Sequence, residues 1–330
     1  MKKWDYTIGI DVSKNTLDVH CSEINEHIQI LNSSEGFKHF LKWCRLKQIA
    51  LNSSFIVLEH TGGYEYKLIQ FCEAHKLQYA RIPGLAIKRS LGIIRGKNDK
   101  IDAARIAQYG EEKHKFLEPA KPLNKTVLQL KELLGFRKRV VREQAGYQGT
   151  LKERKQMYPV NKNDIICASI EQKIKDNAKL IAKLDEQLLI IVETDELIKL
   201  NYLLLTSIRG IGMVNALMTV AYTENFESFK NARSYAVYVG VVPFEYSSGT
   251  SIKGRKKVSP IANKELKQEL SQAARSAIQW DPELREYATR KLNQKCYSIV
   301  LNNVKFKLIL RMFAVVKRKA KFVDIYKKAA

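Results

Sequence analysis

Four acidic residues in the first third of the chain most constrain its fold, because they stand where regular elements begin or end. Asp11 ends an apolar run at residues 6–11, and Glu59 directly follows a second apolar run at residues 55–58. Asp99 and Asp102 are three residues apart in a helix-like segment and therefore share one helix face. Carboxylates delivered to one place by separate elements can hold two divalent cations for phosphodiester chemistry. We therefore expect a fold that gathers these acids around two Mg²⁺ ions.

Each acid alone has a simpler interpretation. Asp102 is also suited to stabilise a helix N-terminus by its charge, and Asp11 is also suited to a turn. A rival interpretation of residues 9–13 (GIDVS) is the phosphate-binding hairpin of sugar-kinase or actin-like ATPases. That fold needs a further glycine-rich phosphate loop late in the chain, and the sequence has none.

Positive charge is concentrated at the other end of the chain. The net charge is +23, and residues 201–330 carry +14 of it. The charge is clustered in runs such as residues 253–257 (KGRKK) and 317–321 (KRKAK). This asymmetry predicts an acidic metal site in one part of the chain and a polyanion-binding region in another, with nucleic acid as the polyanion.

Composition excludes several classes of protein. The five cysteines are dispersed and form no C-x-x-C pair, so neither a disulfide framework nor a zinc site is expected. No apolar stretch reaches the roughly 18 residues that span a bilayer. The first six residues lead straight into a strand-like run, which leaves no room for a signal peptide. We expect a reducing, intracellular setting.

The 330 residues predict three domains, of which residues 1–120 form the first. Its expected strands are residues 6–11, 16–21, 28–31, 55–58 and 78–82, and its expected helices begin near residue 34 and cover residues 65–75, 85–91 and 101–112. A hairpin followed by alternating strands and helices indicates an α/β fold, a mixed sheet with helices packed on it.

Residues 121–200 have a helical pattern. Seven apolar residues follow a heptad: Ile170, Ile174, Ile181, Leu184, Leu188, Ile191 and Ile198. A break at Tyr158 and Pro159 separates this stretch from an earlier one with apolar residues three or four apart. We expect a coiled-coil helical hairpin that forms an arm, with an ordinary pair of core helices as the alternative.

Residues 201–330 predict a third, mostly helical domain. Residues 204–216 have the pattern of a helix-hairpin-helix, in which two glycines allow a tight turn and backbone amides face a phosphate. A loop is expected at residues 244–251, followed by the basic stretch and by helices at residues 263–279 and 299–319. The expected nucleic-acid contacts are Arg209, Gly210, Gly212, Lys253, Arg255, Lys256 and Lys257.

Several short motifs together resemble a known family. Residues 9–14 (GIDVSK), 59–62 (EHTG) and 97–103 (KNDKIDA) resemble the signature of the DEDD insertion-sequence transposases. These are the relatives of Piv invertase that are known as bridge-RNA-guided recombinases. Residues 210–212, 240–243 and 248–249 are similar to the second, serine-bearing transposase domain of that family. The motifs occur in the family's order over nearly the whole chain.

The resemblance implies a fold, a chemistry and partners. It implies a RuvC or RNase H-like domain in which Asp11, Glu59, Asp99 and Asp102 bind magnesium, a coiled-coil arm, and a serine domain. It assigns the DNA-attacking nucleophile to Ser248, with Ser247 as the neighbouring alternative. It further implies donor and target double-stranded DNA, a guide (bridge) RNA, and assembly into homodimers or homotetramers. A cytoplasmic location in a bacterium, in association with the nucleoid, is also implied.

The sequence therefore predicts a DNA recombinase that moves an insertion sequence through a serine–DNA covalent intermediate. Guidance by RNA agrees with abundant Lys and Arg but no evident module for reading bases. Two alternatives stay open. One is a RuvC-like nuclease that cuts DNA junctions with a metal-activated water, and the other is a catalytically decayed relative that only binds nucleic acid.

Overall fold

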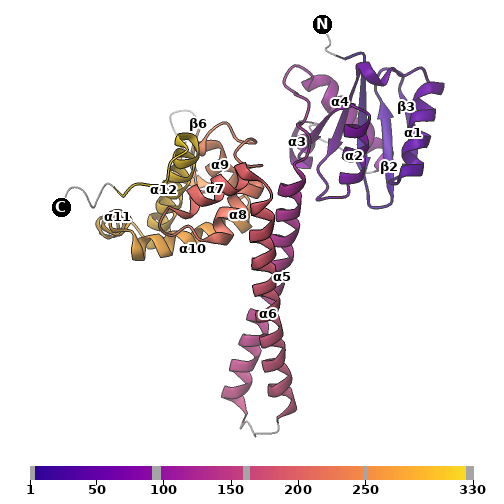
Figure 1. Ribbon diagram of the computed structural model, residues 1–330. Helices are drawn as coiled ribbons and strands as arrows, with labels where there is room; N and C mark the ends of the chain where they lie inside the picture. The colour runs from indigo at the N-terminus through magenta and orange to yellow at the C-terminus, as the bar shows by residue number, and fades with distance from the viewer. Residues whose placement is uncertain (1–3, 91–97, 159–163, 249–251, 325–330) are drawn as a thin grey trace. The chain divides into compact units, whose positions relative to one another are not determined.

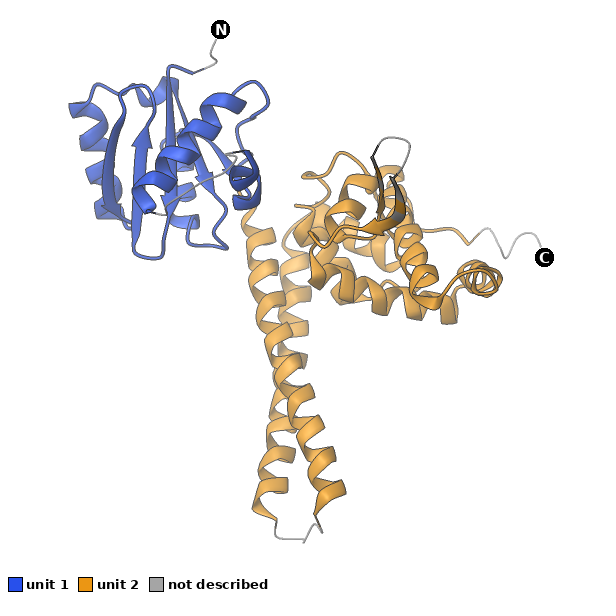
Figure 2. Ribbon diagram, turned by 180° about the vertical axis from the view of Figure 1, so that it is seen from behind, with its two compact units in different colours: residues 1–122 blue, residues 123–330 orange. Residues whose placement is uncertain are grey.

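The computed structural model describes residues 4–90, 98–158, 164–248 and 252–324, and the chain divides into two compact units, residues 1–122 and 123–330 (Figure 2). The side chains of Tyr246, Ser248, Ile252, Lys253 and Arg255 lie outside this description. Within the described residues, no helix is both long enough and apolar enough to cross a bilayer.

Unit 1 contains a five-stranded mixed sheet (Figure 1). Its strands are β1 (Tyr6–Val12), β2 (Thr16–Cys21), β3 (Glu26–Leu31), β4 (Ser54–Glu59) and β5 (Gln78–Ile82), and their order is β3-β2-β1-β4-β5. The first three strands are antiparallel, whereas β4 and β5 run parallel to β1. This confirms the predicted mixed sheet, and the carboxyl ends of β1 and β4 lie next to each other.

One face of the sheet is covered by α1 (Ser34–Leu46) and α2 (Tyr66–Ala74). The alternate residues Ile8, Ile10 and Val12 of β1 are buried on this face. Phe37 of α1 and Phe71 of α2 stack with ring centroids 4.8 Å apart, which joins the two helices over the sheet. Burial of this apolar face stabilises the layer and fixes the strand register.

The opposite face of the sheet is covered by α4 (Asp99–Lys113), and α3 (Gly84–Ser90) precedes it in the chain. Phe55 and Val57 of β4 form one apolar cluster with Ile106 of α4. A strand residue two positions beyond Val57 therefore points toward the same side as α4, and that residue is Glu59. The predicted helices at residues 65–75, 85–91 and 101–112 are confirmed to within one or two residues.

Unit 2 begins with a long helical hairpin, α5 (Lys125–Met157) and α6 (Ile165–Glu193). Cross-helix ion pairs show that the helices are antiparallel: Arg154 pairs with Asp164 at 2.9 Å and Lys155 with Glu171 at 2.8 Å. Of the seven heptad residues, Ile198 lies in the next helix, since Asp195 caps a new helix start before it.

The rest of unit 2 is a helical domain with one core. Its helices are α7 (Glu196–Thr206), α8 (Met213–Tyr222), α9 (Ala232–Val239), α10 (Lys264–Trp280), α11 (Pro282–Leu292) and α12 (Tyr297–Arg318). Val127 and Leu130 of α5 and Leu188 of α6 are buried in the same core as α8, α10 and α12. The base of the hairpin is therefore built into this domain.

A two-stranded antiparallel ribbon projects from the helices. It consists of β6 (Pro243–Ser248) and β7 (Ile252–Val258), with Ser248 opposite Ile252. The expected loop at residues 244–251 is therefore wrong for residues 244–248, which form a strand, and the basic stretch at residues 253–257 is its partner. Residues 249–251 lie outside the described residues.

Candidate metal centre and serine-bearing hairpin

Asp11 is the second-to-last residue of β1, and several other carboxylates lie near it. It is half-buried, and burial together with the charges of Glu59, Asp102, Asp99 and Asp18 raises the pKa of Asp11 to about 6. A carboxyl group that is partly desolvated among like charges binds either a proton or a cation. The raised pKa is thus the electrostatic signature of a concentrated negative site.

Helix α4 reaches Asp11 because the sheet beneath it has a glycine. A Cβ atom at Gly9 would stand 2.2 Å from the backbone nitrogen of Ala107 and 2.4 Å from the carbonyl oxygen of Ala103. The backbones of β1 and α4 are therefore in direct contact. The helix begins at the Asn98 cap, whose side chain accepts a hydrogen bond from the amide of Lys100 at 3.0 Å. This cap places Asp99 and Asp102 in the first turn.

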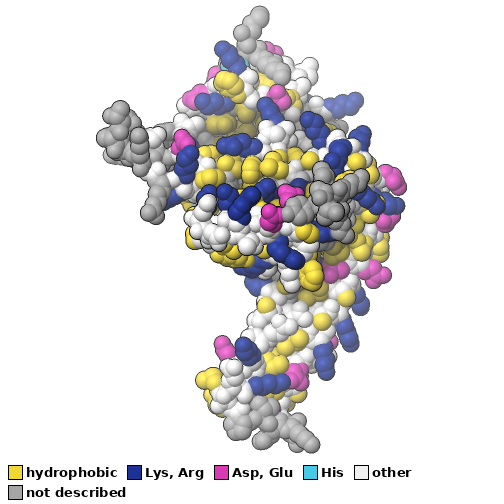
Figure 3. All heavy atoms as spheres, turned by 90° about the vertical axis from the view of Figure 1, so that its left-hand side faces the viewer, with side chains coloured by type: hydrophobic (Ala, Val, Ile, Leu, Met, Phe, Trp, Pro, Cys, Tyr) yellow, Lys and Arg dark blue, Asp and Glu magenta, His cyan; other side chains and the backbone are white. Residues whose placement is uncertain are grey.

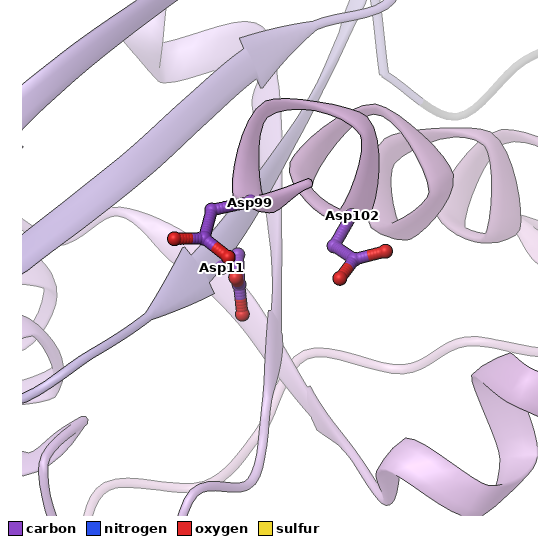
Figure 4. Close-up of side chains that lie close together, drawn as sticks. All are labelled: Asp11, Asp99 and Asp102. Carbon is purple, nitrogen blue, oxygen red and sulfur yellow. The ribbon is translucent and has the colours of Figure 1, made fainter. Parts of the chain in front are cut away.

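The structure brings three of the four predicted acids together. Carboxylate oxygens of Asp11, Asp99 and Asp102 all lie within 4.8 Å of one another. Figure 4 shows that Asp11 comes from the end of β1, whereas Asp99 and Asp102 come from the first turn of α4. Asp99 is exposed, so the cluster is open to solvent, and Asp102 also pairs with Arg105 at 2.9 Å.

Glu59 lies beside this trio but is not part of it. The parallel register pairs Ile10 with Leu58, so Glu59 is the next residue on the strand neighbouring Asp11. Its carboxylate packs against Gly84 at the start of α3, where a Cβ atom would stand 2.0 Å from its Oε1 atom. Glu59 is nevertheless close enough to be the strongest charge acting on the pKa of Asp11.

The donor set fits a hard divalent cation. Mg²⁺ prefers oxygen ligands and binds through one or two carboxylates while keeping several waters. Asp11, Asp99 and Asp102 supply such oxygens, and no thiolate or imidazole belongs to the group. Within the described part of the chain, this is also the only group of three or more His, Cys, Asp or Glu residues with the spacing to hold a metal ion.

A fifth acid, Asp18, was not predicted. It lies opposite Asp11 on β2, is buried, and adds to the negative charge that acts on Asp11. The Nε2 atom of His27 lies 2.8 Å from its Oδ1 atom, and the amide of Gln29 donates to its Oδ2 atom at 3.1 Å. The signal in the sequence is a carboxylate on the inward face of a strand that pairs with the acid-bearing one.

Glu65 organises the loop after Glu59 and was also missed. Its buried carboxylate accepts hydrogen bonds from the Gly63 amide at 2.8 Å, the Thr61 hydroxyl at 3.0 Å and Arg81 at 3.0 Å. Burial raises the pKa of Glu65, but hydrogen bonds from the amides of Glu65 and Gly63 and from Arg81 outweigh it and lower the pKa below its usual range. The loop is thus fixed by an ionised, fully paired carboxylate.

The predicted nucleophile lies at the end of β6, in the other unit. Ser248 is the last residue of that strand and stands next to the residues that join β6 to β7. Ser247, the alternative, pairs with Lys253 in the ribbon and is exposed. Both serines therefore belong to the ribbon rather than to the helices of unit 2.

A cavity of about 400 Å³ opens where this ribbon leaves the helices. Phe244 of β6 and Phe306 of α12 line it, together with the cations Arg233 and Lys256. Lys256 forms an ion pair with Glu245 across the ribbon. Lys257 is exposed on the same strand.

The helix-hairpin-helix residues have contacts of their own within the fold. Gly210 has a positive φ of 91° and touches α10, where a Cβ atom would stand 2.7 Å from the carbonyl oxygen of Ala273. Arg209 pairs with Asp324 at 3.2 Å. Gly212 caps the start of α8 and has open space around it. Of these three residues, Gly212 is the one whose surroundings leave room for a ligand.

Comparisons with known proteins agree over most of the chain. Residues 8–156 match a family model described as "Transposase", and residues 202–289 match one described as "Transposase IS116/IS110/IS902 family". The first range includes all four predicted acids, and the second includes Ser248. The chain is also 26% identical over 270 residues to the pilin gene-inverting proteins of Moraxella lacunata and Moraxella bovis, with 80% of each chain covered.

Proposed function

The chain belongs to the IS110 family of transposases, and we propose that it excises and inserts an insertion sequence by magnesium-dependent strand exchange through a serine–DNA intermediate. The observation that carries the proposal is the meeting of Asp11 with Asp99 and Asp102. The fold holds these acids close together, from positions about ninety residues apart in the sequence, although like charges repel. A bound cation would offset that repulsion.

The acids of unit 1 would act as the metal centre. Magnesium bound there would stabilise charge on a phosphate and favour loss of a proton from the attacking hydroxyl. Asp11, Asp99 and Asp102 would hold the ion, and Glu59 would complete the set from the neighbouring strand. Asp18 would keep the site negative, with its position fixed by His27 and Gln29.

Ser248 would carry the covalent step. Its Oγ atom would attack a DNA phosphorus and form a serine phosphodiester, while one strand P–O bond breaks. The hydroxyl proton of the serine is lost, and the leaving strand oxygen is released as a hydroxyl. The reverse attack by a hydroxyl of another strand would rejoin the DNA and restore the serine. A serine is a weak nucleophile unless a base or a metal activates it.

The surroundings of the ribbon suit a nucleic-acid partner. Arg233 and Lys256 could contact phosphates, and Phe244 and Phe306 offer aromatic surface for a base. The described residues contain no cluster of Cys and His that would form a zinc finger. This supports the proposal that a guide RNA selects donor and target DNA by base pairing. The α5–α6 hairpin would serve as a coiled-coil arm in a homodimer or homotetramer.

Replacement of the two ribbon serines tests the covalent step. With Mg²⁺ and a DNA carrying the ends of the element, we expect Ser248→Ala to abolish the covalent protein–DNA product on a denaturing gel. Ser247→Ala is the matched control and should retain it. The junction-nuclease alternative is favoured if Ser248→Ala cuts DNA at the wild-type rate and neither the variant nor the wild type forms a covalent adduct. Loss of strand exchange in Asp11→Asn, with retained binding, would argue against a decayed relative.

A further inference from the structure

One charged residue stands in the core-facing stripe of α12. Lys305 is 6% exposed, and every other buried residue of that helix is apolar, among them Leu301, Val304 and Leu308. A buried charge costs free energy unless a partner of opposite charge accompanies it. Lys305 therefore needs an explanation that packing does not give.

The charges named as acting on Lys305 are positive. Lys267 and Arg275 of α10 act on its ammonium group, and burial together with these charges lowers the pKa of Lys305 to about 8. Within the described residues, Lys305 has neither a hydrogen-bond partner nor an ion-pair partner. Its Nζ atom is not among the fully enclosed polar atoms that lack partners, so it keeps an opening to solvent.

Two of the three cations lie on α10, and Lys305 lies on α12. Lys267 and Arg275 are eight residues apart and lie on one face of α10, with Ser271 between them. Helices α10 and α12 pack against each other. On the face that Figure 3 shows, Lys and Arg side chains are more frequent than acidic side chains. Lys305 and these two cations therefore belong to one packed pair of helices, and Lys305 has no counter-charge among the described residues.

We propose that Lys305, with Lys267 and Arg275, forms a binding site for a backbone phosphate of nucleic acid on the α10–α12 seam. A phosphate supplies the missing opposite charge and several acceptor oxygens. The buried stem holds the ammonium group in place, so binding immobilises less side chain than it does at a surface lysine. The inference rests on the proposed function, because it takes nucleic acid as the partner.

Lys305→Met tests the site in the full-length protein. The binding of a labelled DNA duplex and of a labelled RNA hairpin is measured by fluorescence anisotropy over a series of salt concentrations. We expect affinity to fall about three- to tenfold and the salt slope to fall by about 0.9, the value for one lost phosphate contact. The nucleic acid that shows the change is the source of the phosphate.

The control is Lys179→Met, which removes an exposed lysine of α6 that lies outside both basic runs and should leave the salt slope unchanged. Folded Lys305→Met protein with wild-type affinity and slope for both probes would overturn the site. If that variant does not fold, Lys267→Ala with Arg275→Ala replaces it, and the same slope criterion decides. Wild-type protein that binds neither probe would overturn the proposed function as well, so the two failures are distinguishable.

Discussion

Gly9 of β1 and Ala107 of α4 are in backbone contact, since a Cβ atom at position 9 would stand 2.2 Å from the Ala107 nitrogen. This contact lowers the first turn of α4 onto the end of β1. The distance between Asp11 and the two α4 acids therefore depends on a residue that carries no side chain. The catalytic proposal can be tested through this contact without altering any acid.

We expect Gly9→Ala to lower the free energy of unfolding by about 1–3 kcal/mol, because the helix must move away from the sheet. The stabilisation that Mg²⁺ gives to the wild-type protein should shrink, since the acids separate. Thermal denaturation with and without Mg²⁺ measures both effects. Gly146→Ala in α5, where an added Cβ meets nothing, is the control and should stabilise by about 0.5–1 kcal/mol. Unchanged stability of Gly9→Ala would contradict the contact.

Asp11→Asn should stabilise the metal-free protein at neutral pH. The pKa of Asp11 is raised to about 6 from its ordinary 3.8, so folding costs free energy once this carboxyl ionises. The stability difference between variant and wild type should be near zero below pH 3.8, grow between pH 3.8 and 6, and reach about 1–2 kcal/mol above pH 6.

Urea denaturation in EDTA across this pH range measures the Asp11 effect. Exposed Asp5→Asn in the same unit is the control for the loss of a surface carboxylate. Added Mg²⁺ should stabilise the wild type more than Asp11→Asn. A variant that is less stable than the wild type at pH 7 would show that the acids do not repel one another as described.

Glu65→Gln should destabilise unit 1 by about 1.5–3 kcal/mol at pH 7, because a charged acceptor of several hydrogen bonds is lost. The pKa of Glu65 is lowered in the folded protein, so its contribution is present above the ordinary pKa of 4.5 and disappears as the pH falls through the folded value. The difference from the wild type should therefore vanish in acid. Denaturation curves at pH 7 and in acid measure the difference in the free energy of unfolding between Glu65→Gln and the wild type. Exposed Glu118→Gln is the reference variant.

Lys305→Met should make the protein more stable and should weaken its binding to nucleic acid. The pKa of Lys305 is about 8 instead of 10.5, so the folded state is penalised while the lysine is charged in the unfolded chain. The gain should be about 1–3 kcal/mol below pH 8 and fade toward pH 10.5. Calorimetry at pH 7 and 10 tests this. A loss of stability at pH 7 would mean that Lys305 has a counter-charge.

The sequence predicted the acid-bearing part well because strands and helices there bury one face. Apolar runs end at Asp11 and Glu59, and this pattern places both at strand ends. Asp18 and Glu65 were missed for a physical reason. Their roles depend on cross-strand pairing and on the distant Arg81, and no local spacing reports such contacts.

The ribbon and two helices of unit 2 were harder to predict. Strand β6 has Phe244, Glu245 and Ser247 exposed, so it lacks the alternation that marks a half-buried strand. Helix α11 buries little beyond Leu284 and Ala288, and α9 is short. In contrast, the predicted helices at residues 263–279 and 299–319 bury long stripes that are mostly apolar, and the structure has both.

The most direct measurement identifies the residue that becomes joined to DNA. Wild-type protein and Asp11→Asn are incubated with Mg²⁺ and a DNA substrate that traps the cut strand, then digested with nuclease and protease for mass spectrometry. We predict a nucleotide phosphate ester on Ser248 in the wild type and none in Asp11→Asn. A nucleotide on another residue, or cut DNA with no peptide attached in the wild type, would contradict the account.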